Sequence, residues 1–242
     1  MIRTFAHWQV HEVTGPVVAI DVVRAFTTAA YAFGVGATAI HLAESLDEVY
    51  RLLDTHPTWL AMGENRGLRP ERFALSNSPV HAAKADLDGR TLVQRTSAGT
   101  RGAVAAKLSD PLLCASLVVA SATSAYLHSA QPGIAPAYII TGCFADAPDT
   151  SGDEDLAAAE YIESLRLALE GPVANNPYPE NISAAEAIQR VLNSPDAVHT
   201  LTLGTEHAHP DDIIYCVDVD RFNFAMVAER QAEGLVLRTV QP

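Results

Sequence analysis

The chain has 242 residues, of which 48% are hydrophobic and 19% are charged, and its formal net charge is −13. This length suits one large domain, and the composition can bury a substantial core. Because nucleic-acid binders usually carry a basic patch, the acidic balance argues against a nucleic-acid partner. An acidic protein that binds an anion must gather positive charge locally, from arginines or from a metal ion.

The cysteines and the apolar segments bear on the compartment. Cys114, Cys143 and Cys216 are scattered with no C-x-x-C pair, which fits a reducing compartment and no structural zinc site. Residues 1–10 lack the apolar region of a signal peptide. Residues 112–127 are too short and too rich in Ser and Thr for a membrane span. We therefore expect a cytoplasmic protein with no membrane partner.

Hydrophobic periodicity predicts strands that alternate with helices along the chain. Strands are expected at residues 17–20, 37–43, 58–62, 90–96, 111–116 and 137–141, with two more joined through Glu233-Gly234 within 222–240. Helices are expected at residues 27–33, 44–54, 102–107, 118–129 and 154–169, and another begins at Ser183 with a capping box to Glu186. The order predicts an α/β fold, a layered α/β/α arrangement with a largely parallel or mixed sheet. Residues 1–242 are expected to form a single domain, with a weak subdivision near 171–182.

The stretch 20–28 is the first candidate for a functional site. Asp21 ends an apolar strand, Arg24 follows it, and Thr27 opens a helix. Ligands of open α/β sheets bind at such strand ends, and Arg24 can clamp an anion bidentately. Because Asp21 has the wrong sign for an anion site, a divalent cation is expected between the two charges. The alternative is a strand-end acid beside a surface arginine.

Two polar stretches lie in the long loop 63–79. Glu64 and Arg66 stand between glycines directly after a predicted strand. Asn77 and Ser78 precede Pro79 and are small enough to line a site. Both stretches are equally compatible with turns, since glycine permits φ > 0 and Asx-type turns often precede proline. Loops of this length in a compact domain are often functional.

The strongest candidate for an anion-binding loop follows the strand at 90–96. It combines hydroxyls, a glycine that permits close backbone approach and an arginine, in the order Thr96, Ser97, Ala98, Gly99, Thr100 and Arg101. The Gly-Lys-Ser/Thr ending of a Walker A loop is absent. Residues 34–39 match G-x-G-x-x-A, but they follow a helix and precede a strand, which is the wrong order for dinucleotide binding.

Acids and histidines provide further candidates for metal ligands. Glu154 and Asp155 open a predicted helix, where acids either complement the helix dipole or bind a metal. His207 and His209 lie in a polar loop, and we expect them to be surface residues.

Several of these motifs together resemble the 2-phosphosulfolactate phosphatase family. The resemblance covers most of the chain from Pro16 onward and is carried by residues 20–28, 63–66, 73–79, 96–101, Glu154-Asp155 with Ala158-Ala159, 212–216 and Asp220. It implies a magnesium-dependent acid phosphatase with an α/β fold, whose substrate is a phosphorylated sulfonated hydroxy acid on a route to coenzyme M. Ala98, where the family typically has asparagine, and residues 151–153 depart from the pattern near the substrate pocket.

These residues lead to a mechanistic hypothesis. Mg²⁺ is held by Asp21, Glu64 and Glu154 or Asp155, and it polarises the phosphoryl oxygens. Arg24, Arg66 and Arg101 bind anionic groups of a small phosphorylated substrate. Other substrate contacts are expected from Thr27, Asn77, Ser78, Thr96, Ser97, Gly99 and Thr100. Attack by water is favoured over attack by Asp21, because Val23 replaces the second acid of the D-x-D motif in haloacid-dehalogenase phosphatases.

The sequence leaves open the alternative function and the oligomeric state. A catalytically idle module that binds or senses an anion on the same fold is the alternative function, and a nucleotide-binding enzyme is disfavoured because both nucleotide motifs fail. The sequence is compatible with a homo-oligomer.

Overall fold

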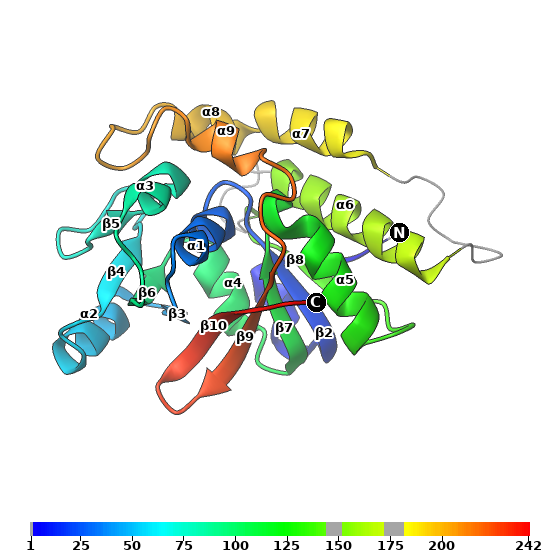
Figure 1. Ribbon diagram of the computed structural model, residues 1–242, viewed down its shortest axis with the longest axis horizontal. Coiled ribbons are helices and arrows are strands. Elements are labelled where there is room, and N and C mark those ends of the chain that lie inside the picture. The colour runs from blue at the N-terminus through cyan, green and yellow to red at the C-terminus, as the bar shows by residue number, and fades with distance from the viewer. Residues whose placement is uncertain (1, 144–151, 172–181) are drawn as a thin grey trace.

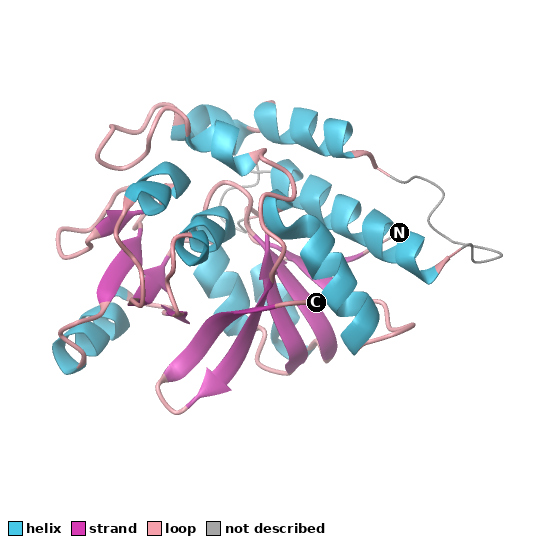
Figure 2. Ribbon diagram, viewed as in Figure 1, coloured by secondary structure: helices cyan, strands magenta, loops and turns pink. Residues whose placement is uncertain are grey.

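The computed structural model describes residues 2–143, 152–171 and 182–242, which form one mixed sheet with helices on both faces (Figure 1, Figure 2). The sheet has ten strands in the order β1-β8-β2-β7-β9-β10-β3-β6-β4-β5. The strands are β1 (Arg3–Phe5), β2 (Gly15–Ile20), β3 (Ala39–Leu42), β4 (Leu60–Gly63), β5 (Leu75–Ser76), β6 (Thr91–Arg95), β7 (Ser109–Ala115), β8 (Ala137–Ile140), β9 (Ala225–Gln231) and β10 (Gly234–Val240).

The α-helices are α1 (Ala25–Gly34), α2 (Leu46–Thr55), α3 (Pro79–Lys84), α4 (Gly99–Ala105), α5 (Ala120–Ala130), α6 (Asp153–Glu170), α7 (Ala184–Leu192), α8 (Pro195–Thr200) and α9 (Asp212–Cys216). Two 3₁₀ helices are η1 (His7–Glu12) and η2 (Leu117–Val119). The predicted α/β fold is confirmed, and of the two sheet types expected the mixed one is present.

The sheet consists of two parallel halves joined by the C-terminal hairpin. β1, β8, β2 and β7 form one half, and β3, β6, β4 and β5 form the other. β9 and β10 lie between the halves, antiparallel to β7 and β3. Neighbouring strands are rotated by about 20–25°, so the pairings from β2 to β6 together turn the strand direction by roughly 100° or more. The twist brings both carboxyl ends to one crevice: a Cβ on Gly99, after β6, would lie 2.6 Å from Asp21 Oδ2, after β2.

Helices cover the two faces of the sheet. On the inner face, α4 packs against β2 and β8 of one half and β3 of the other, and Gln94 Nε2 in β6 donates a hydrogen bond of 2.8 Å to Ala25 O in α1. On the outer face, α5 and α6 cover β2, β7, β8 and β9, while α2 covers β4 and β6. Side-chain alternation in β8 reflects these layers, since Ile139 faces α4 and Tyr138 donates to Glu163 in α6.

Burial differs among the helices as their sequences require. Residues 25–33 of α1 are all buried, because α1 is apolar on every side and lies inside the bend of the sheet. In α2 only Val49 and Leu52 are buried, and its polar side faces solvent. In β2, residues 16–20 are buried because β7 and β8 pair with it on both sides. The first candidate site therefore begins in the best-packed part of the molecule.

Short helices near the pocket were missed by the sequence analysis. α3 and α8 each begin with Ser-Pro: the hydroxyls of Ser78 and Ser194 accept from the N–H groups of His81 and Ala197, and a proline occupies the first turn. Periodicity cannot detect such helices, because they span six residues each. β1, η1, the two-residue β5 and α9 were missed for the same reason of length.

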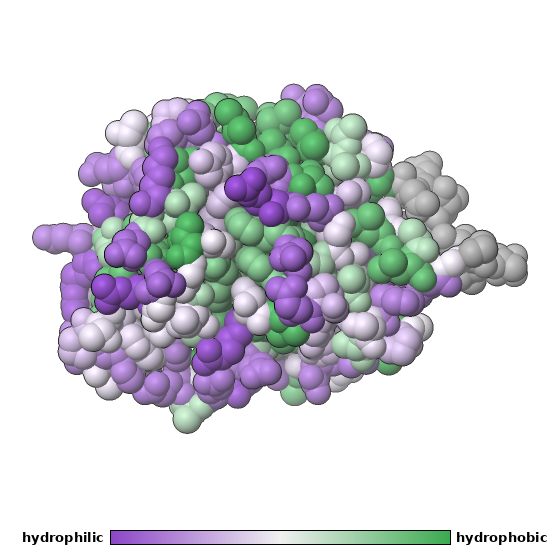
Figure 3. Space-filling view, viewed as in Figure 1, coloured by the Kyte–Doolittle hydropathy of each residue, from purple (hydrophilic) through white to green (hydrophobic). Residues whose placement is uncertain are grey.

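Helices α7, α8 and α9 lie along the top of the molecule in Figure 1. Apolar side chains gather over α7 and α8 on the face in Figure 3. Leu192 of α7 and Val198 of α8 are exposed large hydrophobic residues. The predicted start of a helix after Ser183 is confirmed, since the Ser183 hydroxyl accepts from Glu186 N–H. The subdivision near 171–182 and most of the acidic loop after Gly142 fall in residues 172–181 and 144–151, outside the described residues. None of the described helices is long and apolar enough to cross a membrane.

Candidate active site

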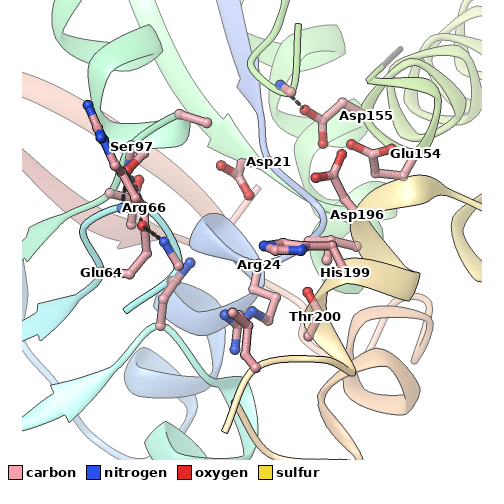
Figure 4. A pocket seen from close by; sticks show the side chains of 17 residues that line it. Asp21, Arg24, Glu64, Arg66, Ser97, Glu154, Asp155, Asp196, His199 and Thr200 are labelled. Carbon is pink, nitrogen blue, oxygen red and sulfur yellow. Dashed lines mark hydrogen bonds between the residues drawn. The ribbon is translucent and has the colours of Figure 1, made fainter. Parts of the chain in front are cut away.

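A cavity of about 190 Å³ lies where β2, β4, β6 and β8 end, beneath α8 (Figure 4). It brings together nine of the predicted site residues: Asp21, Arg24, Glu64, Arg66, Asn77, Thr96, Ser97, Glu154 and Asp155. Asp155, Glu154 and Asp196 lie on one side of it in Figure 4, and Glu64, Arg66 and Ser97 lie on the other, with Asp21 between the two groups. We call these two sides the acidic wall (Asp21, Glu154, Asp155 and Asp196) and the loop wall (residues 64–67 and 95–98).

Backbone N–H groups orient the acidic wall. Asp21 Oδ1 accepts a hydrogen bond of 2.7 Å from Ala25 N, at the start of α1. Asp155 Oδ1 accepts from Val22 N and its Oδ2 from Gly142 N, each at 2.8 Å. Asp155 in α6 is therefore tied to the turns after β2 and β8, and its position follows from the long-range packing of α6 on the sheet.

Burial and mutual repulsion make these carboxyl groups hard to ionise. Burial, opposed by the Ala25 N–H and assisted by Glu64, raises the pKa of Asp21 to about 7. Burial and then the charges of Asp155 and Asp196 raise the pKa of Glu154 to about 10. The pKa of Asp155 is raised well above its usual value by burial and by Asp21, and burial also raises the pKa of Asp196. A cation among these groups would relieve the repulsion.

The loop wall uses its buried acid differently. Glu64 accepts hydrogen bonds from Gly67 N at 2.5 Å, from Ser97 Oγ at 3.1 Å and from Ser97 N. Arg95 Nη1 donates 2.9 Å hydrogen bonds to Glu64 O and Asn65 Oδ1. The Glu64 carboxylate thus joins the loop after β4 to the loop after β6, and both of its oxygens are occupied. Its role as a metal ligand or catalytic residue stays a prediction.

The cationic groups of the pocket are also unlike one another. Arg24 is buried, and its Nη1 donates 2.8 Å to Asp212 Oδ2 and 3.2 Å to His207 O, so its charge is matched inside the protein. Arg66 is exposed, and within residues 2–143, 152–171 and 182–242 its guanidinium makes no hydrogen bond or ion pair.

His207 and His209 are partly buried, and His207 Nδ1 accepts from Arg69 N at 3.0 Å, so the surface position expected for them is only partly correct.

The other predicted substrate contacts divide into two groups. Asn77, Thr96 and Ser97 line the cavity, and Asn77 Oδ1 is buried without a hydrogen-bond partner among the described residues. Five predicted residues lie beside the cavity rather than along it: Thr27, Ser78, Gly99, Thr100 and Arg101. They occupy structural positions or, for Arg101, the exposed surface.

Local hydrogen bonds account for these positions. Thr27 Oγ1 donates to Val22 O at 2.7 Å, and Ser78 Oγ donates to Asp212 Oδ1 at 2.5 Å. Thr100 N donates to Thr96 Oγ1 at 3.1 Å, so α4 begins earlier than expected and takes Gly99, Thr100 and Arg101 into its first turn. The Arg101 side chain then points to solvent instead of toward the cavity.

Sequence reasoning missed the part of the site that α8 and the turn after it supply: Asp196, His199 and Thr200 of α8 and Leu203 beyond it line the cavity. The Ser194-Pro195 start of α8 was a usable signal for a helix. Its i, i+3 spacing then places Asp196 and His199 on one face, toward the cavity. Arg95, which organises the loop wall, was also missed because it lies within a strand.

The donor atoms fit a hard divalent cation such as Mg²⁺. Carboxylate oxygens are the ligands these ions prefer, and Glu154 Oε2 is buried without a hydrogen-bond partner among the described residues. In the part of the chain that the structure describes, no group of three or more His, Cys, Asp or Glu side chains is already arranged around a metal position. The carboxylate oxygens therefore favour an ion at the acidic wall, and the side chains would have to move closer together to surround it.

The fold and the cavity define an α/β protein in which a cluster of carboxylates and two arginines line one cavity at the ends of the strands. Residues 3–231 match the family model of 2-phosphosulpholactate phosphatase, and the chain belongs to that family. A protein of Bacillus subtilis (strain 168) named probable 2-phosphosulfolactate phosphatase is 31% identical over 89% of this chain and 88% of its own. Proteins with the same name are 29% identical in Synechococcus sp. (strain RCC307), over 91% of both chains, and 39% identical in Thermus thermophilus, over 45% of both.

Proposed function

We propose that the chain is a Mg²⁺-dependent phosphatase that hydrolyses a phosphomonoester of a small anionic hydroxy acid, 2-phosphosulfolactate or a related compound. The observation that carries the proposal is the pairing of two opposite charge environments within one cavity. Four buried or partly buried carboxyl groups face arginine and histidine side chains across it. Family membership and the names of the relatives support the same reaction.

The acidic wall is the proposed metal site. Asp21, Glu154 and Asp155 would hold the ion, with Asp196 beside them, and Mg²⁺ bound there polarises the phosphoryl oxygens as a Lewis acid. Glu64, expected from the sequence as a further ligand, already accepts hydrogen bonds at both oxygens. It acts in this proposal by holding Ser97 and Gly67 in place.

Arg24 is the proposed ligand of the phosphoryl group, and the loop wall lies beside it. Arg24 offers guanidinium donors, while Glu64 already accepts the N–H and O–H of Ser97 and holds the loop after β6 in place. Their positions are set before substrate arrives, because Glu64 and Asp212 hold these segments through buried hydrogen bonds. Preorganised donors of this kind stabilise the charge that develops in the transition state.

Water is the proposed nucleophile. Asp21 Oδ1 already accepts from Ala25 N, while Thr141 Oγ1 lies closer to Ile20 O, at 2.8 Å, than to Asp21 Oδ2, at 3.3 Å. Oδ2 is therefore left for the proposed ion, and Val23 stands in place of the second acid of a D-x-D motif, so we favour attack by water. Rapid-quench trapping with labelled substrate tests this step, and a phosphorylated Asp21 peptide would show that Asp21 attacks directly.

The defining experiment measures phosphate release from 2-phosphosulfolactate and 2-phospholactate, with Mg²⁺ and then with a chelator. The proposal expects turnover that the chelator abolishes and added Mg²⁺ restores. Turnover that persists in chelator would remove the metal from the mechanism. A folded protein that releases no phosphate from either compound would instead be an anion-binding module.

A role in a route to coenzyme M and a cytoplasmic location are part of the same proposal. The location is supported by Cys114 and Cys216, which are buried free thiols. Buried cysteines that form no disulfide are typical of reducing compartments.

A further inference from the structure

Helix α8 places one unpaired imidazole in the cavity. His199 lines the cavity, and its ring makes no hydrogen bond or ion pair with any residue of the described ranges 2–143, 152–171 and 182–242. The ring extends from α8 toward the middle of the cavity in Figure 4. His199 Nε2 lies 3.8 Å from the position that a Cβ on Gly67 would occupy, so the imidazole lies against the loop that carries Arg66.

The donors that line the cavity differ in whether they have partners. The charge of Arg24 is matched by the buried carboxylate of Asp212. Arg66, next to Gly67, has no such partner among the described residues. Arg66 and His199 come from segments far apart in the sequence, and in Figure 4 they lie across the cavity from each other. Two donors without partners that line one cavity are suited to an anionic group placed between them.

Arg66 is separate from the acidic wall, whereas His199 lies one helical turn after Asp196 of that wall. Asp155 and Glu154 lie at the opposite side of the cavity from Arg66 in Figure 4, where a cation is expected. A phosphoryl group bound between the walls leaves the rest of the substrate near α8. Thr200 and Leu203 line that end of the cavity, and a Cβ on Gly67 would lie 3.2 Å from Leu203 Cδ2, so the space for substituents is narrow.

Ion pairs hold α8 at this position. Arg190 in α7, just before α8, donates from Nη2 to Asp153 Oδ1 at 2.5 Å and from Nη1 to Glu160 Oε2 at 2.5 Å. Both acids belong to α6, which also carries Glu154 and Asp155. Helix α7, which leads directly into α8, is thus fastened to the helix that supplies half of the acidic wall, and this sets where α8 begins.

We propose that His199, together with Arg66, forms the subsite for the second anionic group of the substrate, a carboxylate or sulfonate on the carbon skeleton of the phosphomonoester. The proposal rests on the proposed function and assigns selectivity within it to His199. The class of ligand is a small phosphomonoester that carries at least one further acidic group. The subsite should not lower KM for a phosphomonoester that lacks such a group.

The test compares three phosphomonoesters that carry two, one or no acidic groups besides the phosphate. The substrates are 2-phosphosulfolactate, 2-phospholactate and isopropyl phosphate, in which a methyl group replaces the carboxylate of 2-phospholactate. In His199→Ala, KM for the two acids should rise about 10- to 100-fold, the effect of losing one charge-assisted hydrogen bond, with little change for isopropyl phosphate. His199→Gln keeps an N–H donor and should recover part of the loss.

Because His199 is exposed, both variants should fold. His11→Ala is the matched control, since His11 is an exposed histidine in η1. The proposal is overturned if His199→Ala leaves KM for the acids unchanged. It is also overturned if kcat for all three substrates falls equally, which would indicate a general role in the chemistry.

Binding of products separates this proposal from the proposed function. Calorimetry with sulfolactate and lactate, in the presence of inorganic phosphate, needs no turnover. Weaker binding of both hydroxy acids to His199→Ala than to the wild type supports the subsite even if no substrate is hydrolysed, in which case only the phosphatase proposal fails. Equal binding to the wild type and the variant overturns the subsite even if phosphatase activity is present.

Discussion

Glu64 and Glu154 are both buried glutamates on the wall of one cavity, and their surroundings are opposite. Glu64 receives hydrogen bonds from Gly67 N and from the backbone and hydroxyl of Ser97. Glu154 lies beside Asp155 and Asp196, its Oε2 has no partner among the described residues, and its pKa is raised to about 10. The comparison teaches that burial of an acid does not by itself indicate function. Acids that are buried side by side are the stronger sign, because their mutual repulsion costs stability in the free protein.

The two walls therefore contribute different things to the site. The Glu64 carboxylate of the loop wall is satisfied in the free protein, which holds the loops after β4 and β6 together. The acidic wall gathers four carboxyl groups that repel one another when ionised, and protons or a cation would relieve that repulsion. Substitutions on the two walls should accordingly have effects of different size, and they should affect different steps.

The largest effect is expected at the acidic wall. Asp21→Asn keeps the size of the side chain but removes a charge and a metal ligand, so kcat/KM should fall by about a thousandfold or more. The measurement is steady-state phosphate release at saturating Mg²⁺. Asp54→Asn is the matched control and should retain normal rates, because Asp54 in α2 is an exposed acid that pairs with Arg72. Activity of Asp21→Asn within tenfold of the wild type would remove this carboxylate from the mechanism.

The second prediction concerns stability without metal. Folding raises the pKa of Asp21 from 3.8 to about 7, so the folded state binds more protons than the unfolded state between these values. The free energy of unfolding in chelator should therefore fall as pH rises from about 4 to about 7, and the raised pKa of Glu154 extends the decline to higher pH.

Urea titrations at several pH values, with chelator and with Mg²⁺, measure this effect. Mg²⁺ should restore stability most at pH 8, since it binds the ionised carboxylates of the folded state. The decline between pH 4 and 7 should be shallower in Asp21→Asn. A wild-type slope that Asp21→Asn leaves unaltered would show that Asp21 ionises normally in the folded protein.

A smaller effect is expected on the loop wall. In Glu64→Gln, the amide group faces N–H donors that the carboxylate now satisfies, so unfolding should become easier by about 1–3 kcal/mol. Loss of loop order should raise KM by about tenfold while the Mg²⁺ concentration for half-maximal activity stays unchanged. Chemical denaturation and Mg²⁺ titrations measure the two effects. A large shift in the Mg²⁺ requirement would instead identify Glu64 as a ligand, as the sequence predicted.

The smallest effect is expected from Arg101→Ala. From the sequence alone, this arginine would contribute about tenfold to thousandfold, as one oxyanion donor does. The structure places Arg101 on the exposed side of α4, outside the cavity. We therefore expect kcat/KM within about threefold of the wild type, as for a solvent-exposed charge. A hundredfold loss would mean that the arginine turns into the cavity when substrate binds.

Much of the site could be predicted where local pattern determines position. Asp21 ends a continuous apolar strand, and Glu64 follows another, so their places at strand ends follow from chain order. Asp155 opens a long helix, as its acidic start indicated. Arg101 was misplaced because α4 begins with Gly99, which turned an expected loop residue onto a helix surface. The direction of a side chain near a helix start changes when the helix boundary moves by one or two residues. Periodicity does not place the boundary that accurately.

The sequence by itself determined the fold class, the C-terminal hairpin and the strand-end acids, because these follow from short-range hydrophobic patterns and turn chemistry. Only the tertiary structure decided that the hairpin lies at the centre of the sheet, between β7 and β3. The same holds for Asp196 and His199, which reach the cavity through the packing of α7 on α6, and for Asp212, whose carboxylate pairs with Arg24 from the other end of the chain. Contacts between segments this far apart depend on the summed twist of the sheet and on buried ion pairs, and no local pattern encodes either.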